Sequence, residues 1–468
     1  MKLFKNKENK TNNLKVIIVG AGKVGVYILS QLVLEGHDVT LVDSDPKKID
    51  TLSEMYDVYG VVGNGASHKI LLEAGIENSD IVIAVTGSDE LNLLCCTIAR
   101  RASKCATIAR VRNPEYSDEI DFIREQLGLA LVINPEYELA REASRIISLP
   151  TALDVYAFGN GRAELVKFKL TEDNILVNTK IMELKNKISV DNVLICAIER
   201  DDEIYIPSGD FRLLAGDVIY VVSSRKYIRS FFKGIGMVSK KVHRVLLIGG
   251  GKASYYLAKQ LIDMNIQVKI IENKKDRANE LSELLPKADI VLGDGTDTDL
   301  LYAEGIESFD AVLPLINIDE ENVMLTLFAR KVSDAKVITR INRIGFKNVI
   351  SDLDLGSVIY PKSITSESIL RFVRAKSNSK ENVNIEALYQ LFDAKAEAVE
   401  FRISSDDTRV IGKKLMELKI KKNILVAYIR RQNTIIIPNG QDSINENDSV
   451  MVVTSGIVLN SIEDILEG

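Results

Sequence analysis

The chain has 468 residues, of which 46% are hydrophobic and 27% are charged, as is usual for soluble globular proteins. Its formal net charge of −6 argues against a dedicated nucleic-acid binder, because such proteins present a basic face. We expect no membrane span, since no stretch of 18 uncharged apolar residues occurs, and the four cysteines lack the spacing of a disulfide framework or a metal site.

Apolar and polar segments alternate along the first part of the chain. Residues 1–13 are polar and lack a secretory signal, so we expect a disordered tail. From Leu14 onward the expected strands are continuously apolar, which predicts an α/β fold with a doubly wound parallel sheet covered by helices on both faces. These strands are Lys15–Val19, Asp38–Val42, Val58–Val62, Asp80–Val85, Thr107–Val111 and Ala130–Ile133.

A glycine-rich loop, GAGKVG, follows the first expected strand at residues 20–25 and opens a helix. In this context Gly20 permits a tight turn, Gly22 lets the backbone approach a pyrophosphate, and Gly25 lets the helix pack close to the sheet. Asp43 ends the next strand, where its carboxylate can accept hydrogen bonds from both ribose hydroxyls and would repel a 2′-phosphate. Loop, strand and acid predict an adenine-nucleotide site, the alternative being a glycine-rich turn without a ligand.

Polar residues also follow later strands, at the sheet edge where ligands bind in such folds. Asn64 follows the third strand, Thr86 and Gly87 follow the fourth, and Arg110 ends the fifth. Asn64 is a candidate for contacting the adenosine and Arg110 for contacting phosphates. A plain turn explains Asn64 nearly as well, and a structural salt bridge explains Arg110 equally well.

Short strands broken by PSG and AGD turns follow this region and predict a small α+β module. The expected strands are Val193–Ile198, Glu203–Ile206 and Asp217–Val222. The segment Phe231–Lys241, which is rich in Gly, Lys and Ser, is the expected joint to the rest of the chain.

The second half of the chain repeats the first. Gly20 pairs with Gly249 at an offset of 229 residues, and Arg110 pairs with Arg340 at an offset of 230. A duplication of one two-domain unit accounts for this pattern. The expected domains are a nucleotide-binding Rossmann-type domain at 14–150, a small regulatory module at 151–232, a second Rossmann-type domain at 242–370 and a second small module at 385–468.

The second glycine loop, GGGKAS, departs from the first. It keeps Gly249 and Gly251 but has Ser254 at the third glycine position, and Glu272 replaces the aspartate. Serine is small enough for the helix to stay close to the sheet, and Glu272 can still reach a ribose. Asp294 takes the place of Asn64, whereas the apolar segment around Ile316 weakens this second site, so a retained fold with an empty site remains the alternative.

Catalytic motifs are missing from the sequence. There are three histidines, and no Ser–His–Asp order, HExxH, Walker A or CxxC pattern occurs. Two binding folds without catalytic residues or metal ligands predict a sensor rather than an enzyme. An NAD-dependent oxidoreductase, and a nucleotide sensor acting on another membrane or transcription partner, stay open as alternatives.

Several motifs together resemble those of a known family, that of the Trk system potassium uptake protein TrkA. In the first half these are GAGKVG, LVDSD, GNGAS, LLEAGI, VIAVTGSDELN and IARVR, and in the second half GGGKAS, GDGTD, LLYAEGIE and IPNG. The resemblance runs from Leu14 to the end of the chain. It implies tandem domains of the kind that regulates potassium conductance.

The resemblance also implies a ligand, a partner and a location. The ligand is NAD or NADH, with ATP or ADP as further candidates, and the chain is a homo-oligomer of four copies, peripheral on the cytoplasmic face of the plasma membrane. A membrane potassium-translocating subunit of the Trk type carries the potassium. The implied contacts are Gly20, Ala21, Gly22, Lys23, Val24, Asp43, Thr86, Gly87 and Arg110 in the first site and Gly249, Gly250, Gly251, Lys252, Ala253, Glu272 and Arg340 in the second.

Overall fold

The computed structural model describes residues 13–467 except 118, 159–161, 189–191, 202, 238–239, 343–352, 354, 380–384, 392–394, 433, 458 and 460. Apart from Asn13, the expected tail lies outside the described residues. The chain forms two compact units. The first contains Met1–Glu138 and Pro361–Asn382, and the second contains Leu139–Tyr360 and Val383–Gly468. Among the described residues, no helix combines the length and the apolar character that crossing a bilayer requires.

The first unit is built on a six-stranded parallel sheet with the order β3-β2-β1-β4-β5-β6. The doubly wound fold expected from the sequence is thereby confirmed, and each expected strand of this sheet is found within one residue at either end. The strands are β1 Lys15–Val19, β2 Asp38–Asp43, β3 Tyr59–Val62, β4 Ile81–Ala84, β5 Ala106–Arg110 and β6 Leu131–Ile133. Because the strand order reverses between β1 and β4, their carboxyl ends border the crevice where such folds bind ligands.

Helices cover both faces of this sheet. Along β1, Val16 and Ile18 belong to one buried apolar cluster, and Ile17 and Val19 belong to the other. This alternation explains why the strand is apolar throughout. The helices are α1 Lys23–Leu34, α2 Pro46–Tyr56, α3 His68–Glu73, α4 Asp89–Ala102, α5 Pro114–Ser117 and α6 Ile120–Leu127.

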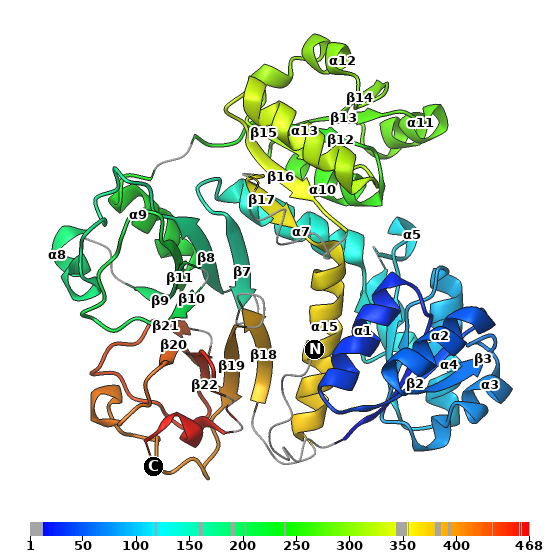
Figure 1. Cartoon of the computed structure of the whole chain (residues 1–468), viewed down its shortest axis with the longest axis horizontal. Coiled ribbons are helices and arrows are strands. Elements are labelled where there is room, and N and C mark those ends of the chain that lie inside the picture. The colour runs from blue at the N-terminus through cyan, green and yellow to red at the C-terminus, as the bar shows by residue number, and fades with distance from the viewer. Residues whose placement is uncertain are drawn as a thin grey trace. The chain divides into compact units, whose positions relative to one another are not determined.

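A helix from the second half of the chain completes the first unit. Helix α15 (Pro361–Ser379) lies beside α1 (Figure 1), and its side chains Ile369, Leu370 and Val373 join the apolar cluster of the first sheet. Arg374 Nε donates to Glu35 Oε1 at 3.1 Å. We expected 242–370 to form one domain, but residues 361–370 pack in the first unit, because their apolar side chains fill the space over α1.

The first half contributes a helix in return. From Leu139 onward, α7 (Pro135–Ser148) belongs to the second unit, although we expected it within a domain at 14–150. Its Ser144 hydroxyl donates to Gln260 Oε1 of helix α10 (Lys252–Asp263) at 2.9 Å. We call α7 and α15 the crossover helices.

The second unit contains a parallel sheet equivalent to the first, with the order β14-β13-β12-β15-β16-β17. Its strands are β12 Arg244–Ile248, β13 Gln267–Glu272, β14 Asp289–Leu292, β15 Ala311–Pro314, β16 Lys336–Arg340 and β17 Ser357–Ile359. The helices around it are α10 Lys252–Asp263, α11 Lys275–Leu284, α12 Thr298–Ala303 and α13 Asp319–Val332.

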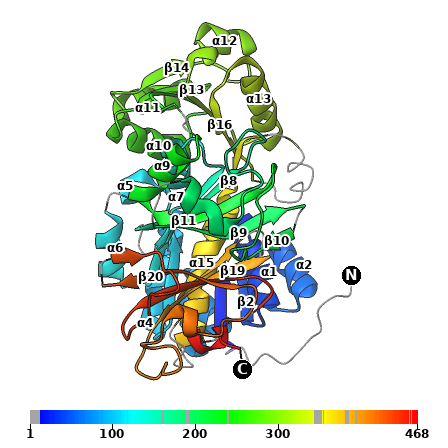
Figure 2. The same ribbon diagram turned by 90° about the vertical axis from the view of Figure 1, so that its left-hand side faces the viewer.

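Two antiparallel sheets complete the second unit, with the orders β10-β9-β11-β8-β7 and β18-β19-β22-β20-β21. Figure 2 shows β8, β9 and β11 of the first sheet beside β19 and β20 of the second. One apolar cluster joins the two sheets, and it includes the rings of Phe158 and Tyr389, whose centroids are 4.5 Å apart. The first sheet has β7 Asp154–Phe158, β8 Ala163–Lys169, β9 Val193–Arg200, β10 Glu203–Tyr205 and β11 Val218–Ser224. The second has β18 Ile385–Leu391, β19 Ala396–Arg402, β20 Ile424–Arg431, β21 Thr434–Ile436 and β22 Ser449–Thr454.

The segment expected to join the two halves begins later than the sequence suggested. Phe231 and Phe232 lie on helix α9 (Arg225–Gly234), and both are buried against Phe168 of β8. Their rings fix the helix to the sheet, so the start of Phe231–Lys241 is part of the core.

Candidate functional site

The loop between β1 and α1 is shaped by its glycines. Gly20 has φ of +111°, and a Cβ there would come within 3.0 Å of the Thr86 backbone nitrogen. A Cβ on Gly25 would lie 1.9 Å from the Gly20 carbonyl oxygen. A Cβ on Gly22, in contrast, would meet no atom within 4 Å. Two of the glycines are therefore needed for packing, and Gly22 leaves open space at the start of α1, where free N–H groups attract phosphate.

Asp43 is held against this loop. Its Oδ2 accepts a hydrogen bond from the Ala21 amide at 2.6 Å, and its Oδ1 accepts one from the Asp45 amide at 2.9 Å. The carboxylate is only partly buried. Since each oxygen has a second lone pair, Asp43 can still accept hydrogen bonds from two ribose hydroxyls. The structure thus places the Asp43 carboxylate beside the glycine loop, and a ribose contact there stays a prediction.

Residues at the start of α1 offer backbone groups. Val24 is buried at the first turn, so a ligand can reach only its amide, whereas the side chain of Lys23 is exposed. Asn64 turns its Oδ1 to the Ala66 amide at 2.9 Å, so it shapes the turn after β3.

The carboxyl ends of β4 and β5 are joined by hydrogen bonds to a residue outside the expected site. Asn92 is fully buried on α4, and its Oδ1 accepts hydrogen bonds from the Thr86 amide and hydroxyl at 2.8 and 2.7 Å. Its Nδ2 donates to the Arg110 carbonyl at 2.9 Å. Asn322 makes the same bonds to the Ile316 amide and the Arg340 carbonyl. The repetition of Asn92 as Asn322 is the sequence signal that identifies this structural role.

Arg110 and Arg112 place two cations at this edge. Burial lowers the pKa of the Arg110 guanidinium, and the nearby Arg112 cation lowers it further. The Arg110 Nε is buried without a hydrogen-bond partner among the described residues. Arg112, which is also outside the expected site, donates from Nη2 to the Gly87 carbonyl, and its Nε lies 3.4 Å from Asp89 Oδ1. An anionic group would satisfy the unpaired Arg110 donor.

The second loop has the same backbone shape. Gly249 has φ of +101°, and a Cβ on Gly251 would meet no atom within 4 Å. The hydroxyl of Ser254 donates to the Gly249 carbonyl, the atom that corresponds to the one Gly25 approaches in the first half. Serine therefore keeps helix α10 close to the sheet, as expected.

Glu272 reaches its loop because a neighbouring residue is smaller. Its Oε2 accepts from the Gly250 amide at 2.7 Å and its Oε1 from the Lys274 amide at 2.8 Å, as Asp43 does in the first half. A Cβ on Gly250 would lie 2.8 Å from Glu272 Oε2, and Ala21 stands at this position in the first loop. The same Cβ would lie 2.6 Å from Leu281 Cδ1, so the lost methyl group makes room for Leu281 as well as for the longer acid, and the two substitutions compensate each other in part.

The remaining residues of the second site are largely occupied by the chain itself. Hydrogen bonds from the Thr296 amide and hydroxyl lower the pKa of Asp294. Arg340 Nη1 donates to the Leu315 carbonyl at 3.2 Å. Lys252 and Ala253 begin α10, and Ala253 is buried, so it offers only its amide.

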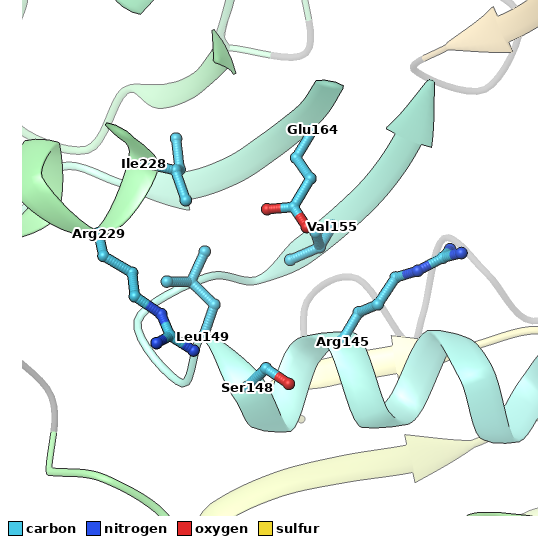
Figure 3. Close-up of a pocket in the computed structure, with 7 residues that line it drawn as sticks. All are labelled: Arg145, Ser148, Leu149, Val155, Glu164, Ile228 and Arg229. Atoms are coloured by element: carbon cyan, nitrogen blue, oxygen red, sulfur yellow. The ribbon is translucent and has the colours of Figure 1, made fainter. Parts of the chain in front are cut away.

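A hollow of about 270 Å³, including space open to solvent, lies in the second unit (Figure 3). Arg145 of α7 and Arg229 of α9 line it together with the buried Glu164 of β8. The sequence did not indicate this hollow, and none of the expected site residues lines it.

The architecture is a tandem repeat in which each Rossmann-type domain precedes a small antiparallel module. The TrkA-N domain model matches residues 16–135 and 245–361, and the TrkA-C domain model matches residues 165–236 and 398–467. The chain therefore belongs to the family of the Trk system potassium uptake protein TrkA.

Relatives of similar length are known. A TrkA homolog 2 from Methanosarcina mazei is 33% identical over 97% of this chain and 100% of its own length. The TrkA protein of Haemophilus influenzae is 32% identical over 94% of this chain and 96% of its own. The GsuK channel structure covers 96% of this chain and 78% of its own chain, with a TM-score of 0.63 at 16% identity. A GsuK channel bound to NAD gives a TM-score of 0.62, and both likenesses concern the fold.

Proposed function

We propose that the chain is a cytoplasmic regulatory subunit of a potassium uptake system, which binds NAD or NADH and controls a membrane potassium-translocating partner of the Trk type. The observation that carries the nucleotide part is the open space at Gly22 beside Asp43, whose carboxylate the Ala21 amide holds at 2.6 Å. The relatives align with nearly the full chain, and their names support the transport part of the proposal. The neighbour with bound NAD supports the choice of ligand.

In this proposal, different residues of the first site bind different parts of the ligand. The amides at the start of α1 hold the pyrophosphate, Asp43 holds the adenosine ribose, and Arg110 supplies a cation at the far edge. Such a ligand bridges the ends of β1, β2 and β5. It can shift the partner only by the ratio of its affinities for two arrangements of the protein. ATP or ADP, which share the adenosine, are further candidate ligands.

No chemical step is assigned to this site. Thr86, the hydroxyl residue at the end of β4, donates its proton to Asn92 and accepts from the Ser88 amide at 3.3 Å. A group held in this way is poorly suited to move a proton to or from a substrate. The oxidoreductase alternative predicts consumption of NADH with added substrates, which absorbance at the nicotinamide band measures.

Self-association into a ring of four chains is part of the proposal. Exposed apolar side chains occupy equivalent positions in both halves, and contacts between copies would remove them from water. On α4 and α13 these are Leu94, which is 52% exposed, and Met324, which is 66% exposed. The other equivalent pairs are Met55 with Leu284, Val62 with Leu292, and Leu72 with Tyr302.

The binding test uses the full chain. NADH, NAD, ATP and ADP are titrated by calorimetry against the wild type, Asp43→Ala, and the control Asp50→Ala, which removes an exposed carboxylate from α2. We expect Asp43→Ala to weaken NADH binding by at least tenfold and Asp50→Ala to leave it unchanged. Flux through the reconstituted transporter should then respond to NADH with the wild type and lose that response with Asp43→Ala. Equal binding by all three proteins would contradict the proposed site.

A further inference from the structure

The second glycine loop is held by a side chain that has no equivalent contact in the first half. Arg277 lies on the first turn of α11, at the position equivalent to Lys48 with the offset of 229 residues. Lys48 Nζ lies 3.8 Å from Asp45 Oδ2, and half of its side chain is exposed. In the second half Lys274 replaces Asp45, so Arg277 cannot form that pair.

Arg277 turns instead to the loop. Its Nε donates to the Gly250 carbonyl at 2.8 Å, and its Nη1 lies 2.8 Å from Glu280 Oε2 on the same helix. Only 21% of the side chain is exposed. The guanidinium is therefore fixed between the glycine loop and α11.

This contact closes the ribose end of the second site. Gly250 is bonded on both sides, through its amide to Glu272 and through its carbonyl to Arg277. Glu272 is only 8% exposed, whereas Asp43 in the first half is partly open to solvent. Asp43 is therefore more accessible to a ribose than Glu272 is.

The closed arrangement leaves one donor unsatisfied. The Nη2 of Arg277 is buried without a hydrogen-bond partner among the described residues. A buried guanidinium N–H that lacks an acceptor is unfavourable, and it regains water when the side chain swings out. The contact is therefore suited to open, unlike a residue of the apolar core.

We propose that Arg277 is a latch on the second glycine loop, which lies where a ribose would bind and makes the second site weaker for NADH than the first. This inference rests on the proposed nucleotide binding. Arg277 thus determines which of the two duplicated loops responds to the nucleotide at low concentration.

The test measures the second site alone, in a full chain whose first site carries Asp43→Ala. NADH affinity is determined by calorimetry with and without Arg277→Ala, and also with Arg277→Lys, which restores the side chain of the first half. We expect either change to raise the affinity at least tenfold. Lys48→Ala in the same background is the matched control and should have no effect. Unchanged or weaker binding in Arg277→Ala would overturn the latch, since weaker binding would make Arg277 a ligand contact.

A second measurement needs no nucleotide. Hydrogen exchange of the amides in residues 249–252 should become faster in Arg277→Ala, while Lys48→Ala leaves residues 20–23 unchanged. If neither the wild type nor Asp43→Ala binds a nucleotide, the proposed function fails. Hydrogen exchange still tests whether Arg277 holds the second glycine loop. Exchange in residues 249–252 that is unaffected by Arg277→Ala would overturn the latch.

Discussion

At the turn from β1 to α1, glycines five residues or fewer apart serve different purposes. Gly25 is needed because the carbonyl oxygen of Gly20 occupies the space of a side chain, 1.9 Å from the Cβ position. Gly22 faces open space instead. The same kind of residue therefore supports the fold at one position and leaves room for a ligand at the other.

Alanine substitutions separate these two roles. We expect Gly25→Ala to destabilise the first unit by about 2 kcal/mol or more, because backbone must move to accept the methyl group. Gly22→Ala should leave the melting temperature of the nucleotide-free protein nearly unchanged and weaken NADH binding. Thermal melts with and without NADH measure both effects. Unchanged NADH binding in Gly22→Ala would show that its open space is not a ligand space.

The compensation between Gly250 and Glu272 predicts non-additive behaviour. Gly250→Ala alone brings a methyl group within 2.8 Å of Glu272 Oε2, so we expect a loss of about 1–3 kcal/mol. Adding Glu272→Asp shortens the acid and recreates the Ala21 and Asp43 pair of the first half. The double variant should regain part of the stability, because Leu281 Cδ1, 2.6 Å from the position of the new methyl group, still has to move. Denaturant unfolding of all four proteins gives the coupling energy, and additive losses would contradict the compensation.

Among the secondary-structure elements, β16 carries an unusual buried cation. Lys336 at its start donates to the Ala152 carbonyl at 2.6 Å, which joins the β16 edge to the segment before β7. Burial lowers the pKa of Lys336 to about 8, with the Asp154 carboxylate opposing the shift and Arg330 adding to it. The charged form is thus disfavoured in the folded protein.

This shift has a definite sign. Between pH about 8 and 10.5 the unfolded chain binds more protons than the folded one, so Lys336 makes the free energy of unfolding rise with pH. The contribution is at most about 3 kcal/mol. Lys336→Met should remove this part of the pH dependence. Denaturant unfolding of the wild type and of Lys336→Met at pH 7.5 and at pH 10 measures it, as the difference between the two proteins in how the free energy of unfolding changes with pH. Parallel pH profiles for wild type and Lys336→Met would contradict the prediction.

The crossover helices link the stability of each sheet to the other half of the chain. Ile369 of α15 is fully buried against the first sheet. We expect Ile369→Ala to cost about 2–5 kcal/mol and to speed hydrogen exchange in α1 of the first half. Glu125→Ala, an exposed change on α6, serves as the control. If only the second half became less protected, α15 would not belong to the first core.

At the scale of the whole molecule, the duplicated sheets were predictable and their completion was not. Continuously apolar runs such as Lys15–Val19 fit only a sheet covered on both faces, so their positions agree with the structure. The apolar stripe of α15 fits either sheet equally well, because both sheets present the same kind of surface. Sequence periodicity therefore cannot tell which copy receives the helix.

The two glycine loops of the candidate site were predictable to a similar degree. GAGKVG with Asp43 and GGGKAS with Glu272 identify both loops, because their spacing along a strand–turn–helix is specific. The contact of Arg277 with the loop was not predictable from the sequence motif, because it depends on Lys274, three residues earlier, which stands at the position of Asp45 in the first half. The buried phenylalanines of α9 were misassigned to a joint because the neighbouring glycines and lysines dominate the local composition.

The exchange of α7 and α15 also bears on how such a chain arises. If the two halves were separate molecules, each would lack its own last helix and would be complete only as a pair. Joining them in one chain turns an association that depends on concentration into one with a fixed, high effective concentration. A gene that joins two copies of a helix-exchanging protein through a linker would thus be favoured over separate copies. Each copy could then change independently, as the two glycine loops have.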